Sequence, residues 1–324
     1  MWLEDAERFA RYLRRDEIHT AFNFDFMARP WRAKELRESI DGTLEAHRGV
    51  GAPPTWVLSN HDVTRPVTRY GRDDSAFAFA AKRFGTPTDL ALGRRRARAA
   101  ALLTAALPGC LYVYQGDELG LPEVEDLPLA AIQDPMHERS GGVDPGRDGC
   151  RVPLPWSGDR PPFGFSPVPG AVPDAVPGAV PDAVPGAVPD VEPWLPQPAD
   201  WAGLTAERQA VDPASTLSLY RQVLALRRRL DHDAPLRWLD APPEVLAFAR
   251  GSLACVVNLG PDPVVLPEHR AVLLSSGALA DGLLHPDDAV WLALPDGSRA
   301  PGVDRPDPTD PPNDELPNIP APKE

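Results

Sequence analysis

The sequence predicts an α/β fold of parallel strands alternating with helices, followed by a small antiparallel β-domain. Up to residue 114, helix-like and strand-like segments alternate along the chain. This order is typical of parallel strands joined by right-handed crossover connections. After Pro235 the pattern changes to short apolar runs separated by turn residues, which indicates an antiparallel sheet.

The helices are predicted from apolar residues that recur at the helical period. We expect them at residues 4–14, 31–47 and 94–107. A further amphipathic helix is expected at 215–230, where leucines and a valine form an apolar stripe and arginines form the opposite face.

The strands of the first part are predicted at three places. Residues 18–26 alternate aromatic and polar side chains at the strand period, and 56–58 and 111–114 are short apolar runs. In the second part, short strands are expected at 245–248, 253–257, 264–266, 271–274 and 290–294.

The run at 56–58 ends abruptly in four polar residues, Ser59, Asn60, His61 and Asp62. Polar groups at the carboxyl end of a parallel strand lie where α/β barrels keep their chemistry. The simplest interpretation of such a short run alone is a strand followed by a polar turn. The flanking sequence favours a functional site.

Composition and charge disfavour several classes of function and partner. The net charge of −14 disfavours a nucleic-acid partner or an anionic membrane, because both need a basic surface. Cys110, Cys150 and Cys255 are an odd number without paired spacing, which indicates reduced thiols and a cytoplasmic protein. We find no pattern of a signal peptide or membrane span, and we predict no cofactor or metal ion.

The 41 prolines indicate that part of the chain is irregular. Residues 171–190 repeat Ala-Val-Pro-Asp and Ala-Val-Pro-Gly, so 167–193 is interpreted as a low-complexity, proline-rich insertion in a surface loop. Residues 296–324 are rich in Pro and Asp and are expected to be a disordered tail.

Several segments together carry a resemblance to a known family. They are "AFNFDF", "SNHDVTRPVTRYG", "LYVYQGDELGL", "GRDGCRVPLPWSG" and "PWLPQPADWAGLT". In order and spacing they resemble α-glucosidases of the α-amylase superfamily, close to oligo-1,6-glucosidases and trehalose synthases. The resemblance implies that 1–233 is the C-terminal part of a (β/α)8 TIM barrel, with 18–26, 56–58 and 111–114 as strands six to eight. Residues 234–295 would be a C-terminal β-sandwich-like domain.

The same resemblance implies roles for five residues. Asp62 would be the catalytic carboxylate that stabilises the transition state, and His61 and Asn60 would bind the sugar. An arginine of the loop after strand eight would also reach the sugar, with Arg147 favoured over Arg151. Alternatively, both arginines only brace the loop. We expect the Asp62 carboxylate to lie within about 4 Å of one of them, an ion-pair distance.

The family also needs a nucleophile and an acid/base, because retaining glycosidases use two carboxyl groups about 5–5.5 Å apart. No motif matching either one is found in the sequence. Asp25, Asp117 and Glu118 lie near predicted strand ends, but such acids are common. The sequence therefore predicts a truncated α-glucosidase, acting on α-glucoside oligosaccharides in its full-length relatives and inactive as the isolated chain.

Three alternatives stay open. The chain could be the C-terminal half of a split glycosidase or trehalose synthase that binds an N-terminal barrel fragment. It could be a non-catalytic carbohydrate-binding or interaction protein, or an unrelated small α/β enzyme. An incomplete barrel would also leave the 18–26 strand as an open edge carrying Phe22, Phe24 and Phe26. Such an edge predicts poor solubility or self-association.

Overall fold

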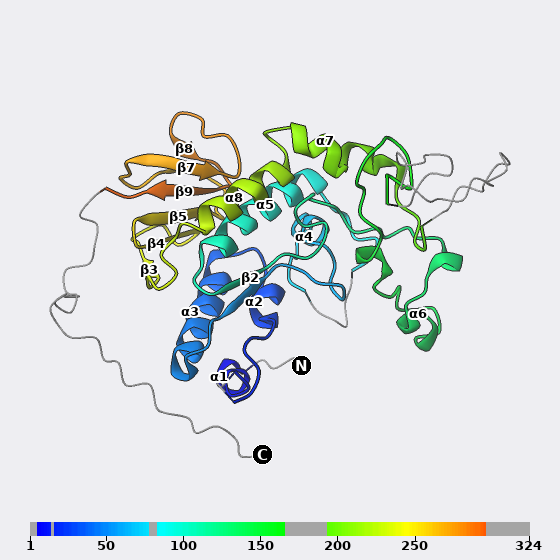
Figure 1. The fold of residues 1–324 in the computed structure, drawn as a ribbon, viewed down its shortest axis with the longest axis horizontal. Helices are drawn as coiled ribbons and strands as arrows, with labels where there is room; N and C mark the ends of the chain where they lie inside the picture. Colours follow the sequence, from blue (N-terminus) through cyan, green and yellow to red (C-terminus); the bar gives the residue numbers. More distant parts are fainter. Residues whose placement is uncertain (1–4, 14–15, 78–82, 166–192, 296–324) are drawn as a thin grey trace, which may run out of the picture.

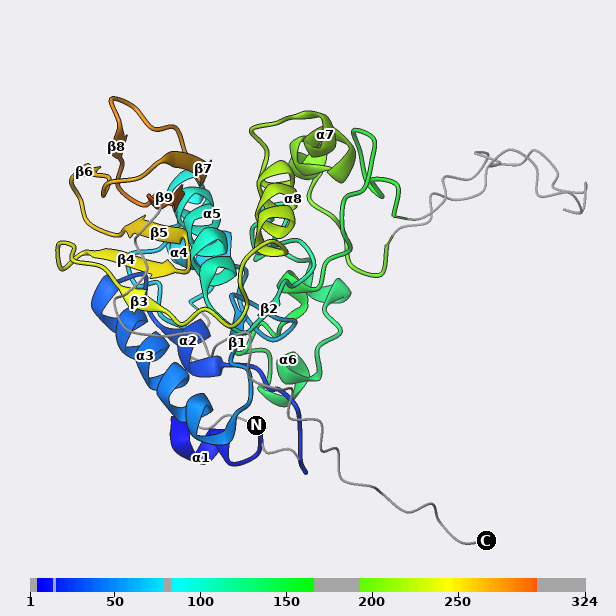
Figure 2. The same ribbon diagram turned by 60° about the vertical axis from the view of Figure 1, so that its left-hand side comes forward.

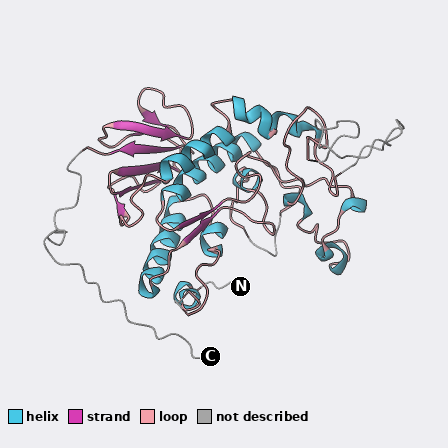
Figure 3. Cartoon of the chain, in the orientation of Figure 1, coloured by secondary structure: helices cyan, strands magenta, loops and turns pink. Residues whose placement is uncertain are grey.

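The computed structural model describes residues 5–13, 16–77, 83–165 and 193–295 (Figure 1). The proline-rich insertion, apart from its last residue, and the predicted tail at 296–324 lie outside the described residues. Two groups of strands are visible, a small sheet near the middle of the molecule and a larger group formed by residues 237–293 at the upper left (Figure 3). Helices lie between and around them.

The small sheet consists of two parallel strands, as predicted from the apolar runs. They are β1 (Thr55–Val57) and β2 (Cys110–Tyr112), with Trp56 opposite Leu111. The connection between them contains α4 (Pro66–Tyr70) and α5 (Leu90–Ala106). The long connection is the kind that parallel neighbours require.

The strand predicted at residues 18–26 is wrong. Residues 18–23 form neither strand nor helix, and α2 (Phe24–Ala28) is helical. The Asn23 side chain caps this helix by accepting a hydrogen bond of 3.1 Å from the Phe26 backbone N–H. In the described part of the chain no strand pairs with this segment, so nothing offsets the local preference for a capped turn.

The other predicted helices are confirmed, with shifted ends. They are the short α1 (Ala6–Ala10), α3 (Ala33–Val50), α5 and α8 (Thr216–Arg227). The Asp89 side chain caps α5 by accepting hydrogen bonds from the backbone N–H groups of Ala91 and Leu92. Helix α3 is followed by Gly51, whose φ of 67° is the left-handed conformation that favours glycine.

The segment between β2 and α8 is mainly loop, with short helical turns. They are η1 (Leu129–Ala131), α6 (Pro135–Arg139), η2 (Asp148–Cys150), η3 (Ala199–Leu204) and α7 (Ala206–Val211). A separate apolar cluster that includes Val152, Phe163 and Trp201 is buried among them. This segment extends away from the large sheet, with α6 at its far end (Figure 1). In Figure 2 the large sheet and α7 lie on opposite sides of α5.

All five strand segments predicted in the second part are confirmed. The large sheet is antiparallel, in the order β3-β4-β5-β9-β7, and a separate pair joins β6 to β8. The bounds are β3 (Arg237–Trp238), β4 (Val245–Arg250), β5 (Leu253–Asn258), β6 (Val264–Val265), β7 (Ala271–Ser275), β8 (Leu283–Leu284) and β9 (Ala289–Ala293).

One apolar core joins the large sheet to the helices. One face of the sheet, with Phe248 and Trp291, packs against buried side chains of α3, α5 and α8. The Trp291 indole N–H donates to the carbonyl of Leu102 in α5 at 3.0 Å. No helix in the described part of the chain is both long and apolar enough to cross a membrane.

Candidate functional site

The polar end of β1 forms a tight turn. Asn60 accepts a hydrogen bond of 2.8 Å from the Asp62 backbone N–H through Oδ1, an Asx turn that reverses the chain directly after the strand. Asn60 is buried, and its amide nitrogen faces the sulfur of Met27 at 4.0 Å. The side chain of Asn60 therefore shapes the turn. Its direct contact with a sugar stays a prediction.

Ser59, one residue earlier, points into the protein. Its hydroxyl bonds both carboxylate oxygens of Asp117, at 2.8 and 2.9 Å. Asp117 follows β2, so this contact joins the carboxyl ends of the two parallel strands. Burial raises the pKa of Asp117 to about 6, and the Ser59 hydrogen bond opposes that rise.

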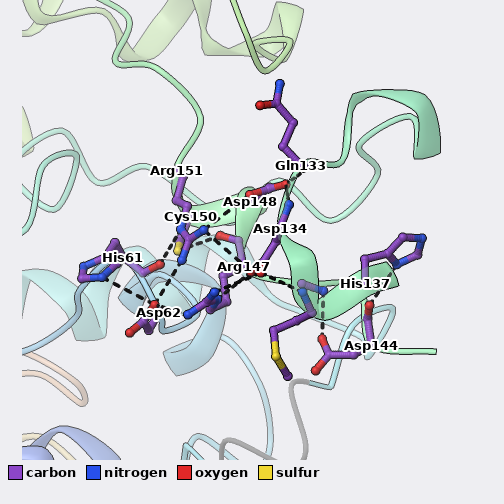
Figure 4. A network of polar contacts seen from close by, with 12 residues as sticks. His61, Asp62, Gln133, Asp134, His137, Asp144, Arg147, Asp148, Cys150 and Arg151 are labelled. Atoms are coloured by element: carbon purple, nitrogen blue, oxygen red, sulfur yellow. Dashed lines mark hydrogen bonds and ion pairs between the residues drawn. The ribbon is translucent and has the colours of Figure 1, made fainter. Parts of the chain in front are cut away.

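Asp62 lies at the tip of the turn and binds two arginines (Figure 4). Its Oδ1 oxygen accepts from Arg147 Nη1 at 2.8 Å and from Arg151 Nη2 at 3.1 Å. The ion pair expected between Asp62 and this loop is therefore present, and it involves both arginines rather than one. Among the described residues no hydrogen bond reaches the other oxygen, Oδ2.

Two further aspartates hold the arginines in place. Asp134 makes a bidentate pair with Arg147, at 2.6 and 2.9 Å, and its side chain is fully buried. The hydrogen bond from Arg147 holds the pKa of Asp134 far below its usual range, and that from Asp134 raises the pKa of Arg147. Asp148 lies 3.6 Å from Arg151 and accepts from the backbone N–H groups of Gln133 and Asp134.

His61 is the most exposed member of the group. About two thirds of its side chain is accessible, and its Nε2 lies 3.6 Å from Asp62 Oδ1. Its backbone carbonyl accepts a hydrogen bond of 2.8 Å from Arg151 Nε. The structure thus brings together His61, Asp62, Arg147 and Arg151 around one carboxylate.

An open cavity of about 530 Å³ begins beside this group. His61 and Arg151 form part of its wall, and Tyr114 and Gln115 come from the chain just after β2. The rest of the wall is apolar side chains of the loop segment, most of them aromatic. A cavity with mostly apolar walls, a few polar side chains and one charged side chain is typical of small-molecule sites.

The three acids near predicted strand ends are held by other partners. Asp25 pairs with Arg29 at 2.6 Å and accepts from Ser39, and Glu118 accepts from the backbone N–H of Gly116. Asp117 is the buried partner of Ser59. Within the described ranges, no group of three or more His, Cys, Asp or Glu side chains is arranged to hold a metal ion.

Comparison with known proteins identifies the family of this chain. Residues 2–170, just over half of the chain, match the family described as "Alpha amylase, catalytic domain". The chain belongs to the α-amylase family. It is 30% identical over 223 residues to the probable α-glucosidase of Rhizobium meliloti (strain 1021). The aligned region covers 66% of this chain and 31% of that protein. It is 24% identical over 248 residues to the oligo-1,6-glucosidase of Parageobacillus thermoglucosidasius, covering 67% of the chain and 36% of that protein.

Solved structures of the family share the fold. The α-glucosyl transfer enzyme XgtA has a TM-score of 0.65 at 26% identity, covering 90% of this chain and 49% of that one. The isomaltulose synthase of Klebsiella sp. LX3 has a TM-score of 0.64 at 21% identity, covering 89% of this chain and 53% of that one. The α-amylase family chain thus spans about a third of the curated relatives and about half of these structures.

Asp134 and Asp148 are site residues that sequence reasoning missed. Asp148 lies in "GRDGCRVPLPWSG", one of the segments that carried the resemblance, and neither aspartate follows a predicted strand. The available signal was charge balance, because two arginines close to one carboxylate require further anions. Helix capping was a second signal, since Asp134 precedes Pro135 and caps α6.

Proposed function

We propose that this chain binds the terminal glucose ring of α-glucosides at Asp62 and does not hydrolyse them as an isolated polypeptide. Asp62 takes the role of the carboxylate that stabilises the transition state. His61, Arg147 and Arg151 bind the sugar. Asn60 contributes to sugar binding by holding the turn that positions Asp62. We assign β1 and β2 to barrel strands seven and eight, with the β-domain beginning near residue 234.

The observation that carries this proposal is the pairing of Asp62 with two arginines through a single oxygen. A carboxylate fixed at Oδ1 keeps Oδ2 available to accept hydrogen bonds from a diol, and exposed His61 offers a ring nitrogen beside it. The positive charge that develops on a glycosyl ring in the transition state is stabilised by a carboxylate held in this way.

The proposed lack of hydrolysis is supported by the carboxyl groups that surround Asp62. Asp134 is fully buried, and Asp148 is nearly so. Asp134 is bound by Arg147 and its pKa is lowered, so it is a poor proton donor, and Asp148 is bound by backbone N–H groups. Because other groups hold both carboxyls, neither suits the two tasks of the retaining mechanism, attack on the anomeric carbon and protonation of the leaving oxygen.

The open β1–β2 sheet favours a second candidate, the C-terminal half of a split glycosidase. Each of the two strands has one neighbour within the described residues. A second polypeptide that extends this sheet and supplies the two carboxyl groups would produce hydrolysis of α-glucosidic bonds. The same chain then contributes the sugar subsite and its partner contributes the nucleophile and the acid/base.

One experiment tests the proposed function on the full chain. We expect glucose and maltose to bind weakly, and Asp62→Asn to lower the affinity for both about tenfold, because loss of one charged hydrogen-bond acceptor typically has this effect. Leu129→Ala, which alters a well-exposed side chain outside the cavity, is the control. An aryl α-glucoside should give no turnover. Turnover that Asp62→Ala abolishes would disprove the lack of hydrolysis, and unchanged affinity in Asp62→Asn would disprove the subsite.

A further inference from the structure

A second cavity is formed where α5, α8 and β7 meet, and it shares no residue with the Asp62 group. It is an open groove of about 450 Å³, within the range of about 300–1,000 Å³ that is common for ligand sites. Figure 2 shows α5 between the large sheet and α8. Arg98 of α5 lies in the wall of the groove, together with Leu219 and Gln222 of α8.

The other side of the groove is formed by seven consecutive residues, 272–278. Successive side chains of a strand point to opposite faces of a sheet, so an unbroken run of this kind lines the edge of a strand rather than one face. β7 is the last strand of the large sheet and pairs only with β9 among the described residues. The groove therefore lies along the unpaired edge of β7.

Arg98 is the charged side chain of this wall. Its Nε donates to the carbonyl of Ser276 at 2.9 Å, and its Nη1 donates to Thr216 Oγ1 at 3.4 Å. Within the described ranges no hydrogen bond reaches Nη2, and no ion pair joins Arg98 to a carboxylate. Burial lowers the pKa of Arg98, and Asp288 and Asp212 oppose that change from beyond ion-pair distance. A half-buried cation usually has an anionic partner, and Arg98 lacks one.

Two more arginines lie on the same face of α5. Arg94 and Arg95 precede Arg98 by four and three residues, the spacings that make helix side chains neighbours. Neither side chain has a hydrogen bond or ion pair to any residue that the structure describes, and the Nε of Arg94 is buried without a partner. Like charges at these spacings destabilise a helix. Three arginines without ion pairs, in a chain whose net charge is −14, indicate a site for an anion.

The two carboxylates near Arg98 do not balance this charge. Asp288 accepts from the Ser276 hydroxyl at 3.1 Å, and burial raises its pKa, so its charged form is costly. Asp212 is exposed and accepts from the backbone N–H of Ala214 at 2.8 Å. At most two negative charges therefore accompany three positive ones.

We propose that this groove binds a small organic oxyanion, a phosphate or carboxylate group on an apolar body, and that Arg98 is the residue that holds its charged end. Guanidinium groups match the geometry of both oxyanions, and the Nη2 of Arg98 is available to donate. Arg94 and Arg95 attract the anion to the groove. The apolar body contacts Leu273 and Pro213, which are exposed in the same wall.

Calorimetric titrations of the full chain at constant ionic strength test the site, with phenyl phosphate, benzoate and the neutral benzyl alcohol as probes. We expect the better of the two anions to bind at least about tenfold more tightly than benzyl alcohol, as a charged hydrogen bond provides. Arg98→Gln should remove this preference, and Arg98→Lys should keep part of it. Arg94→Gln should weaken anion binding about threefold, because it removes a nearby charge. Arg229→Gln, the same change at an exposed position outside the groove, is the matched control. Circular dichroism confirms that each variant is folded.

The outcomes decide between an anion site and a merely basic surface. The stronger binder of phenyl phosphate and benzoate identifies the anionic group. Benzyl alcohol binding as tightly as both anions, or no binding of either anion, overturns the proposal. Equal weakening by Arg94→Gln and Arg229→Gln also overturns it, because net charge would then control binding. Arg94 has no hydrogen bond to lose, so its variant keeps the test valid even where Arg98→Gln unfolds. Asp62→Asn should leave anion binding unchanged, so this site and the proposed sugar site fail separately.

Discussion

The two sheets of this molecule are built on opposite principles. In the large sheet, β4, β5 and β9 are buried along their whole length, and their side chains alternate between two apolar clusters on opposite faces. In the small sheet, β1 is buried but only three residues long, and its carboxyl end leads into polar residues. The first sheet is held by apolar area and ladder hydrogen bonds, and the second depends on polar contacts beyond its strands.

Buried arginines provide many of those polar contacts. Arg65, fully buried, donates to the carbonyls of Gln115 and Cys150, at 2.8 Å each. Arg69 donates to the carbonyl of Leu58, directly after β1, also at 2.8 Å. Carbonyl groups at strand ends need partners when they are removed from water, and these guanidinium groups provide them. The sheet with the site is thus stabilised largely by charged hydrogen bonds, and the sheet without it by apolar packing.

The largest effect is expected from a cavity in the large sheet. Trp291 is fully buried in the core shared by β9 and α5. Trp291→Ala should lower the free energy of unfolding by about 4 kcal/mol, because a buried indole and its hydrogen bond to Leu102 are lost. Val265→Ala, at an exposed position of β6, should change it by less than about 0.5 kcal/mol. Urea denaturation monitored by circular dichroism measures both, and equal effects would contradict the assignment of the core.

The second effect is a pH dependence that originates at the small sheet. Asp117 has a pKa raised from 3.8 to about 6 by burial. Between these values the folded state keeps a proton that the unfolded state has released, so stability falls as pH rises from about 4 to about 6. The loss should reach about 3 kcal/mol at most, at 1.36 kcal/mol per pKa unit. Thermal unfolding at a series of pH values measures it.

Two variants identify the group responsible for this pH dependence. Asp117→Asn keeps an acceptor for Ser59 and cannot ionise, so the fall between pH 4 and 6 should become smaller, while the share of Glu123, whose pKa burial raises to about 7, should remain. Ser59→Ala removes the hydrogen bond that favours the charged form, so the fall should extend above pH 6. Asp134 has the opposite sign: its pKa is lowered, so its contribution is lost as pH falls below about 4. A profile unchanged in Asp117→Asn would assign the slope to another residue.

The success of sequence reasoning follows the same division between the sheets. Four of the five strands of the large sheet were predicted, and the two-residue β3 was missed. Burial of β4, β5 and β9 on both faces leaves a clear apolar pattern in the sequence. At the small sheet, the Asp62–arginine contact was expected from the resemblance. The roles of Asp134 and Asp148 were not, since partner choice among charged side chains depends on tertiary geometry.

The strand at 18–26 failed for a related reason. Alternating aromatic and polar residues describe a segment that could pair, but they do not provide the neighbouring strand. In the structure Phe26 packs on Trp56 from a helix, with ring centroids 5.2 Å apart, and is buried. Phe26 therefore lies in the core without forming the ladder hydrogen bonds of a strand. Phe22, by contrast, is exposed and the polar Asn23 is buried, so the alternation predicted neither the backbone of this segment nor the full set of its buried side chains.

The smallest effect concerns the exposed edge of the small sheet. The predicted edge at 18–26 is not formed, but β2 pairs only with β1 among the described residues, and Tyr112 and Val113 are each 40% exposed at its end. Phe22 lies against Tyr112, with ring centroids 5.0 Å apart, and extends this apolar patch. An unpaired apolar strand edge is a template for another chain, so we expect two copies to associate weakly through it.

Val113→Lys should raise the dissociation constant about tenfold, because a charge would have to be buried at the edge. Val143→Lys, which adds the same charge to a loop residue that is 85% exposed, should leave it unchanged. Sedimentation velocity over a range of concentrations distinguishes the cases. A monomer at all concentrations would show that the edge is protected, and equal weakening by both lysines would show that net charge, rather than the edge, controls association.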